Sequence, residues 1–345
     1  MKKILTICFF FVFGTSVLAH STKNINIDIR AECKKSKSVL NWVSKNKLSK
    51  GGELIKFKSF SGFDQRTVLT DGHKKNPIEI TGYLQLPEGS SKVPIVIWTH
   101  SSGGPGEYVW NDFVYHGTKN LIDAGIGVMY VDNFCHRGAK DTWRDQSKVP
   151  LINGAIDAIM AYKLLQSHPR SNGKFGTTGH SRGGNNSLYL ADVKFTSKFL
   201  DGTSGFDAIL PEAAECKLAG FFNKPELTSN TKLLYVHGAA DDYTLPKPCE
   251  DYVNKIKSEP GQIEIDMKDG WYHGFHYGQK PKKYKLYSSL DDFYKGAQEE
   301  PKKTWKNSFK VLKKEKCLDR GVMIGGDHMD EYMPQFINFF KENLL

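Results

Sequence analysis

The feature that most restricts the fold of this chain is the alternation of short apolar runs with amphipathic stretches. Val93–Trp98 and Gly127–Val131 are apolar segments rich in β-branched residues, as is typical of strands buried on both faces of a sheet. Asn153–Gln166 places apolar residues three and four positions apart, which indicates a helix. Strands that alternate with helices predict an α/β protein with a mainly parallel, doubly wound sheet and helices on both faces.

The rest of the chain continues this alternation. Ile78–Leu86 alternates apolar and polar side chains, as an early antiparallel strand does. Further strands are expected at Phe175–Gly179, Lys232–Val236 and Ile263–Met267, and a last helix at about Glu331–Asn343. With 345 residues, one large domain accounts for nearly all of the chain.

The first residues have the layout of an export signal. Lys2 and Lys3 precede an apolar core, Ile4–Phe13, and Val17-Leu18-Ala19 forms a small-residue cleavage site. The apolar core is short for a membrane span, and a polar segment follows it. We therefore predict a signal peptide over residues 1–19 and a soluble, exported mature protein, periplasmic or secreted, that begins at His20 and has no stable membrane insertion.

Charge and cysteine content restrict the partners. The formal net charge is +10, and loss of Lys2 and Lys3 leaves +8. The lysines are dispersed and no nucleic-acid motif occurs, so a solvated basic surface is favoured over a nucleic-acid or membrane partner.

Five cysteines remain beyond the signal, none in C-x-x-C spacing, so no metal cluster is predicted. Export permits disulfides, but an odd number leaves at least one thiol free or paired between chains, and the connectivity stays open.

Residues 179–183 match G-x-S-x-G, the pattern of a nucleophile elbow. The pattern follows the predicted strand Phe175–Gly179 and precedes a helical segment. A serine in such a turn has strained backbone geometry and exposes its hydroxyl at the edge of the sheet, and any Cβ at the flanking glycines would collide with neighbouring backbone. Ser181 is therefore the predicted nucleophile.

A Ser- and Gly-rich loop, His100–Gly104, follows the Val93–Trp98 strand. Next to a nucleophile elbow, the loop after this strand supplies one backbone N–H of an oxyanion hole, and the residue after the nucleophile supplies the other. The predicted donors are therefore Ser102 and Arg182.

Two further strands end in residues suited to complete a catalytic triad. Asp241 follows the Lys232–Val236 strand and is the predicted acid, with Asp242 as the alternative. His273 follows the Ile263–Met267 strand and is the predicted base, with His276 as the alternative. The chain order of serine, aspartate and histidine is the one that an elbow of this kind requires.

Together these motifs resemble the dienelactone hydrolase family. The resemblance covers about residues 78–340 and rests on His100–Gly104, Asp132-Asn133-Phe134 with Arg137-Gly138, Gly179–Gly183, Gly238–Asp241 with Pro246 and Cys249, His273-Gly274-Phe275 and Gly321–Gly326. It implies a single-domain α/β-hydrolase fold and cleavage of ester or lactone bonds in a small-molecule substrate, without a cofactor. In two places the chain departs from the family. Ser181 stands where dienelactone hydrolase proper has cysteine. Ser101 stands where glycine is usual, and its side chain is expected to narrow the approach to the oxyanion hole.

Three questions stay open. Arg137 is a candidate contact for a substrate carboxylate, with an ion pair to Asp132 or Asp141 as the alternative. Residues 277–316, rich in Lys, Tyr and Asp, form either an irregular excursion near the active site or a solvent-exposed connection. A peptidase, an acyltransferase and a non-catalytic binding protein are alternatives to an ester hydrolase, and the oligomeric state is not predicted.

Overall fold

The computed structural model describes most of the chain between residue 38 and the C-terminus. The described residues are 33, 38–45, 52–143, 146–201, 205–217, 221–228, 230–284 and 321–345. The predicted signal peptide and residues 285–316 therefore lie outside the described part. None of the described helices combines the length and the apolar character that a membrane span requires.

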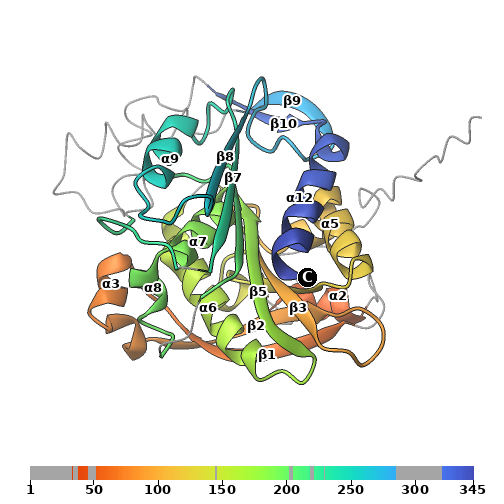
Figure 1. Cartoon of the computed structure of the whole chain (residues 1–345), viewed down its shortest axis with the longest axis vertical. Helices are drawn as coiled ribbons and strands as arrows, with labels where there is room; N and C mark the ends of the chain where they lie inside the picture. The colour runs from red at the N-terminus through yellow and green to blue at the C-terminus, as the bar shows by residue number, and fades with distance from the viewer. Residues whose placement is uncertain are drawn as a thin grey trace, which may run out of the picture.

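Eight strands form one central sheet in the order β1-β2-β4-β3-β5-β6-β7-β8 (Figure 1). Their bounds are β1 Glu53–Phe60, β2 Pro77–Gln85, β3 Val93–Thr99, β4 Gly127–Asp132, β5 Ser171–His180, β6 Ala208–Glu212, β7 Lys232–Gly238 and β8 Ile263–Lys268. β2 pairs antiparallel with β1 and with β4, and every other neighbouring pair is parallel. This mainly parallel sheet with an antiparallel edge confirms the predicted α/β-hydrolase fold.

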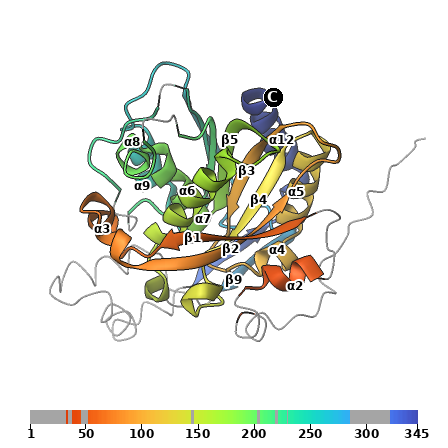
Figure 2. The same ribbon diagram turned by 90° about the horizontal axis from the view of Figure 1, so that it is seen from below.

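Helices cover both faces of the sheet, as predicted. Figure 2 shows α6 and α7 on one side and α5 and α12 on the other. The α-helices are α2 Leu40–Lys45, α3 Gln65–Leu69, α4 Glu107–Trp110, α5 Asp112–Asp123, α6 Ile152–Gln166, α7 Arg182–Ala191, α8 Val193–Thr196, α9 Pro246–Val253 and α12 Met329–Leu344, and the short 3₁₀ helices are η2 Gly72–Lys75, η3 Cys135–Arg137 and η4 Gln146–Lys148.

The apolar run in β3 explains why both faces need cover. Ile95 and Ile97 point into the core formed with α6 and α7, whereas Val96 and Trp98 point into the core formed with α5 and α12. Successive side chains of a strand point to opposite faces, so an uninterrupted apolar run requires an apolar layer on each side. The sequence pattern of this strand therefore leads directly to the layered architecture.

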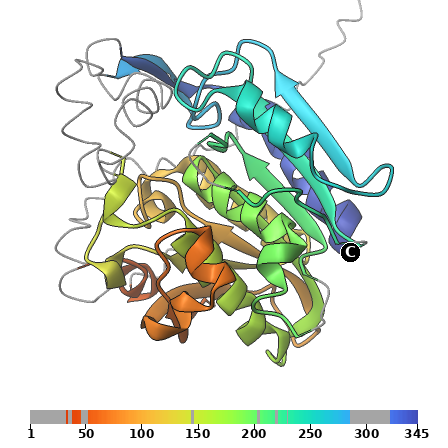
Figure 3. The ribbon, with the colours of Figure 1, turned by 90° about the vertical axis from the view of Figure 1, so that its left-hand side faces the viewer.

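The start of the segment predicted to be irregular is a strand. β9 (Gln279–Tyr284) pairs antiparallel with β10 (Val322–Gly326) in a separate two-stranded ribbon (Figure 3). The N–H of Gly325 donates to the carbonyl oxygen of His273 (2.7 Å), so the ribbon packs on the loop that carries the predicted base. Its partner strand lies beyond residue 320. Because the two strands are so far apart in the sequence, no local pattern predicts that they pair.

Two disulfides join four of the cysteines. Cys33 bonds with Cys135, and Cys216 bonds with Cys249. The fifth cysteine of the predicted mature chain, Cys317, lies outside the described residues.

We predict that the double variant Cys216→Ser/Cys249→Ser has a free energy of unfolding about 2–4 kcal/mol lower than the parent protein. The bond spans 33 residues, and its loss restores conformational freedom to the unfolded chain. Urea denaturation followed by tryptophan fluorescence measures the difference. Equal unfolding free energies for the variant and the oxidised parent protein would contradict the prediction.

Candidate active site

The turn between β5 and α7 carries Ser181. β5 ends at His180 and α7 begins at Arg182, so Ser181 is the single residue between a strand and a helix. Its backbone has φ 57° and ψ −116°, a conformation that costs a residue with a Cβ on the order of 1–3 kcal/mol. The N–H of Ser181 donates to the carbonyl oxygen of Glu212 (2.8 Å), so the end of β6 holds the strained turn in place.

Two glycines permit this turn. A Cβ on Gly183 would lie 2.3 Å from the carbonyl oxygen of Thr99, and a Cβ on Gly179 would lie 2.4 Å from the same oxygen. Because the obstacle is backbone of the neighbouring β3 strand, it cannot rotate away as a flexible side chain does. The glycines of the G-x-S-x-G pattern are therefore a steric requirement of this fold.

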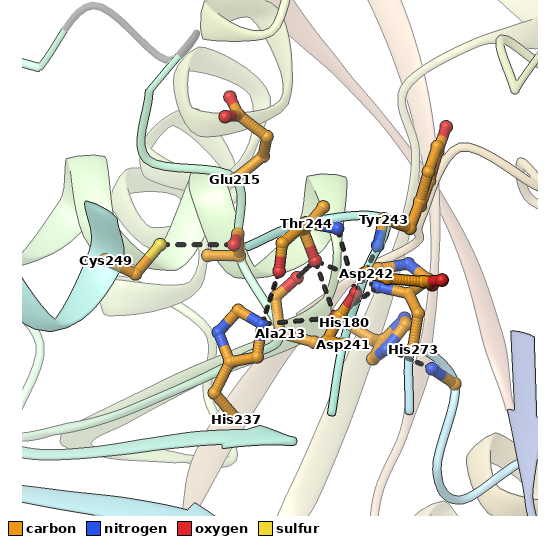
Figure 4. A network of polar contacts seen from close by, with 12 residues as sticks. His180, Ala213, Glu215, His237, Asp241, Asp242, Tyr243, Thr244, Cys249 and His273 are labelled. Atoms are coloured by element: carbon orange, nitrogen blue, oxygen red, sulfur yellow. Dashed lines mark hydrogen bonds and ion pairs between the residues drawn. The ribbon is translucent and has the colours of Figure 1, made fainter. Parts of the chain in front are cut away.

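The loops after β7 and β8 bring Asp241 and His273 together. Oδ2 of Asp241 accepts a hydrogen bond from Nδ1 of His273 (2.8 Å), and both side chains are buried (Figure 4). Because Nδ1 carries the proton in this contact, Nε2 of neutral His273 is the nitrogen with a free lone pair.

The carboxylate of Asp241 has an unusually complete set of donors. It accepts hydrogen bonds from the N–H groups of Tyr243 (2.9 Å) and Thr244 (2.9 Å), from the Thr244 hydroxyl (2.8 Å) and from His237 Nε2 (3.1 Å). Burial by itself raises the pKa of Asp241, but the charge of His273 and the hydrogen bonds from His237 and His273 outweigh burial and hold the pKa well below its usual value. Asp241 is therefore ionised at neutral pH and stabilises a protonated His273.

The alternatives for the acid and the base have other partners. Oδ1 of Asp242 accepts a hydrogen bond from the N–H of Met323 in β10 (2.8 Å). His276 is buried against Phe113, with ring centroids 4.2 Å apart. The structure thus pairs His273 with Asp241 and uses Asp242 to hold the β9–β10 ribbon.

His273 lies beside the elbow without bonding to the serine. Its ring packs against His180, the residue before Ser181, with centroids 4.6 Å apart. Within the described part of the chain, no hydrogen bond joins Ser181 Oγ to His273. Such bonds are often long in a protein without substrate and shorten when substrate binds.

The loop after β3 is fixed at its base by His100. Nδ1 of His100 donates to the carbonyl oxygen of Ser101 (2.8 Å), and Nε2 accepts from the N–H of Asn133 at the end of β4 (3.1 Å). Burial lowers the pKa of His100 to about 3, so the ring stays neutral and keeps one donor and one acceptor. His100 thereby ties the predicted oxyanion loop to the neighbouring strand.

Glu107 in α4 binds the same loop at Ser101, and no sequence motif marks this glutamate. Oε2 of Glu107 accepts from the N–H of Ser101 (2.9 Å), and Oε1 accepts from the Ser101 hydroxyl. Burial raises the pKa of Glu107 to about 7, against the opposing effect of these bonds. The hydroxyl that stands where glycine was expected is thus bound by Glu107.

The two predicted oxyanion donors have the required free N–H groups. Arg182 is the first residue of α7, and an N–H in the first turn of a helix has no partner within the helix. Among the described residues, the backbone N–H groups of Arg182 and Ser102 donate to no acceptor. Both are therefore available to an oxygen of a substrate.

The structure corrects the prediction for Arg137. Its guanidinium forms a bidentate pair with Asp157 of α6, at 2.6 and 3.0 Å, and not with Asp132 or Asp141. The other N–H groups donate to the carbonyl oxygens of Asn133 and Phe60 and to the Ser61 hydroxyl. All five guanidinium donors are engaged, so none is free for a substrate carboxylate. Asp157 is the only acidic residue of α6 and lies 20 positions from Arg137, so no local pattern connects the two.

A second buried acid lies behind the elbow. Oε1 of Glu212 accepts from the Tyr332 hydroxyl (2.8 Å), and Oε2 lies 3.9 Å from Nδ1 of His276. Burial raises the pKa of Glu212 to about 8 and lowers the pKa of His276 to about 3. Both groups are therefore neutral at pH 7, and their contact is not an ion pair.

Nothing in the described residues forms a metal centre. No three His, Cys, Asp or Glu side chains of this part gather closely enough to hold an ion. The polar side chains around His273 bond one another instead.

Comparisons with known proteins give structural similarity alone. No protein-family model and no curated protein matches the sequence. Solved structures that resemble the chain include Est1E from Butyrivibrio proteoclasticus (14% identity, 77% of this chain and 95% of that chain, TM-score 0.45). XC6422 from Xanthomonas campestris, described as an α/β serine hydrolase without a lid, is 14% identical over 64% of this chain and 86% of that chain, with a TM-score of 0.41. Similarities this low say nothing about the function of this chain.

We predict that Glu212→Gln weakens the pH dependence of stability. Between the ordinary pKa of 4.5 and the folded pKa of about 8, the folded protein keeps a proton that the unfolded chain has released. Stability therefore falls as the pH rises through this interval, by up to about 1.4 kcal/mol per pH unit from this one group.

Urea titrations at pH 5, 6.5 and 8 measure this effect. The glutamine variant keeps an acceptor for Tyr332 and should gain stability relative to the parent protein as the pH rises. Glu264→Gln, at an exposed position in β8, serves as the matched control. The same pH slope for all three proteins would rule out a protonated Glu212.

Proposed function

We propose that this protein is an exported serine hydrolase that cleaves carboxylic ester or lactone bonds through an acyl-enzyme on Ser181. The observation that carries the proposal is the Asp241–His273 hydrogen bond, which comes from the loops after β7 and β8 and lies beside the strained serine turn. A buried, ionised aspartate that orients a histidine next to a serine in a strand-to-helix turn is the arrangement of a nucleophilic triad.

In this mechanism, Nε2 of His273 accepts the proton of the Ser181 hydroxyl as its oxygen attacks the substrate carbonyl carbon. The carbonyl oxygen takes the negative charge, and the N–H groups of Ser102 and Arg182 bind it. The protonated His273, stabilised by Asp241, gives its proton to the departing alcohol, and the acyl group stays on Ser181. Water then attacks the acyl carbon and loses a proton to His273, which passes it to the Ser181 oxygen as the bond to the acyl group breaks and the acid leaves.

The proposed location follows from two features. The first residues have the layout of a signal peptide, and two disulfides form within the described residues. Structural disulfides persist in oxidising compartments, so they support export to the periplasm or beyond the cell.

We predict that Ser181→Ala abolishes activity on short-chain aryl esters, with kcat at least about 10⁴-fold lower. A serine-directed phosphonate probe should label the parent protein on Ser181 and leave the variant unlabelled. Ser197→Ala, at an exposed position after α8, is the matched control and should keep full activity. A parent protein without labelling and without ester turnover would exclude the proposal, and labelling with turnover of peptides alone would favour a peptidase.

We predict different effects for the two neighbouring aspartates. Asp241→Asn should lower kcat by about 10³–10⁴-fold, because the amide removes the charge that stabilises protonated His273. Asp242→Asn should leave kcat within about threefold, since an amide oxygen still accepts from Met323. Steady-state kinetics on one aryl ester compare the two, and equal losses would contradict the assignment of Asp241 as the acid.

A further inference from the structure

The two oxyanion donors belong to different elements, and their separation must be held constant. Ser102 lies in the loop after β3, whereas Arg182 begins α7 after β5. Donors of an oxyanion hole act through preorganisation, so a shift between these two elements reduces the stabilisation of the transition state.

The side chain of Gln146 bridges these two residues. Nε2 of Gln146 donates to the Ser102 hydroxyl (2.7 Å), and Oε1 accepts from a guanidinium nitrogen of Arg182 (2.7 Å). A guanidinium only donates, so the amide oxygen must face Arg182 and the amide nitrogen must face Ser102. The orientation of the amide is thereby determined by its partners.

The segment that carries Gln146 binds both residues a second time. The N–H of Thr142 donates to the carbonyl oxygen of Ser102 (2.8 Å), and the Thr142 hydroxyl accepts from Arg182 (3.3 Å). The carbonyl oxygen of Val149 accepts from the other guanidinium nitrogen. Residues of one short segment thus contact both sides of the predicted oxyanion hole.

The Arg182 side chain is a rigid part of this connection. It is buried, and its guanidinium lies over the ring of Phe134, 5.1 Å from the centroid. A buried charge needs its hydrogen bonds, so loss of the Gln146 acceptor displaces the guanidinium and with it the first turn of α7.

We propose that Gln146 is a positioning residue: it sets the separation of the Ser102 and Arg182 N–H groups and does not contact Ser181 or the substrate. The inference rests on the proposed ester hydrolysis and adds a residue to its machinery. It gives Thr142, Gln146 and Val149 a role in positioning the two donors that none of the sequence motifs indicated.

The test compares Gln146→Ala, Ser102→Ala and the double variant. Ser102→Ala keeps the backbone N–H but removes the hydroxyl that Gln146 contacts. We expect Gln146→Ala to lower kcat on an aryl ester by about 10–100-fold with KM within threefold, because the loss falls on the transition state. The double variant should lose no more than about twofold beyond Gln146→Ala, since both changes break the same connection.

Two further variants distinguish a loss of kcat caused by displaced N–H donors from a loss caused by lower stability. Gln146→Glu should recover most of the lost kcat, because a carboxylate accepts from Arg182 and from the Ser102 hydroxyl. Gln335 in α12 is the matched control, because its side-chain amide donates to Asp266 over the same distance (2.7 Å). Gln335→Ala removes this hydrogen bond and should leave kcat unchanged. Urea denaturation of each variant shows whether stability changes with kcat.

Each outcome bears on the inference. Unchanged kcat for Gln146→Ala in a protein that hydrolyses esters would overturn the positioning role and leave the proposed function intact. Independent, multiplicative losses in the double variant, or no recovery in Gln146→Glu, would overturn it as well. Should Gln146→Ala fail to fold, Ser102→Ala and Gln146→Glu decide between these outcomes by the same measurements. A parent protein that neither turns over esters nor reacts with the phosphonate would exclude the proposed function itself, and this inference with it.

Discussion

The hydrogen bond from the Ser181 N–H to the carbonyl oxygen of Glu212 is the contact on which the site depends. It joins the strained turn after β5 to the end of β6, and the parallel pairing of these strands keeps it in register. The same turn packs against the end of β3, where Thr99 leaves no room for a Cβ on Gly179 or Gly183. Neighbouring strands thus stabilise a backbone conformation that the isolated segment would not adopt.

Two buried carboxyl groups near this turn have opposite protonation states. Asp241 accepts five hydrogen bonds, two of them from histidines, and these partners keep it ionised despite its burial. Glu212 accepts one hydrogen bond through its side chain, from Tyr332, and burial keeps it neutral at pH 7. The charge of His273, together with the hydrogen bonds from His237 and His273, outweighs burial at Asp241, and only a charged carboxyl group can stabilise a protonated His273.

The loops around the turn are held by polar contacts between residues distant in the chain. His100 links the β3 loop to β4, Glu107 binds Ser101, and Gln146 links Ser102 to Arg182. Arg137 illustrates the same rule, because its guanidinium is fully used in joining η3 to α6 and β1. Residues that a sequence pattern marks as available for substrate can therefore be structural, and unmarked residues can shape the site.

The sequence by itself predicted the fold class and placed the candidate nucleophile Ser181, two candidate acids and two candidate bases after β5, β7 and β8. Apolar periodicity and turn chemistry are local properties, and parallel strands bring their carboxyl ends to one edge of a sheet. Only the tertiary structure decided which aspartate contacts His273, that Asp157 is the partner of Arg137, how the cysteines pair and how β9 finds β10. Each of these depends on contacts between distant segments, which no local pattern encodes.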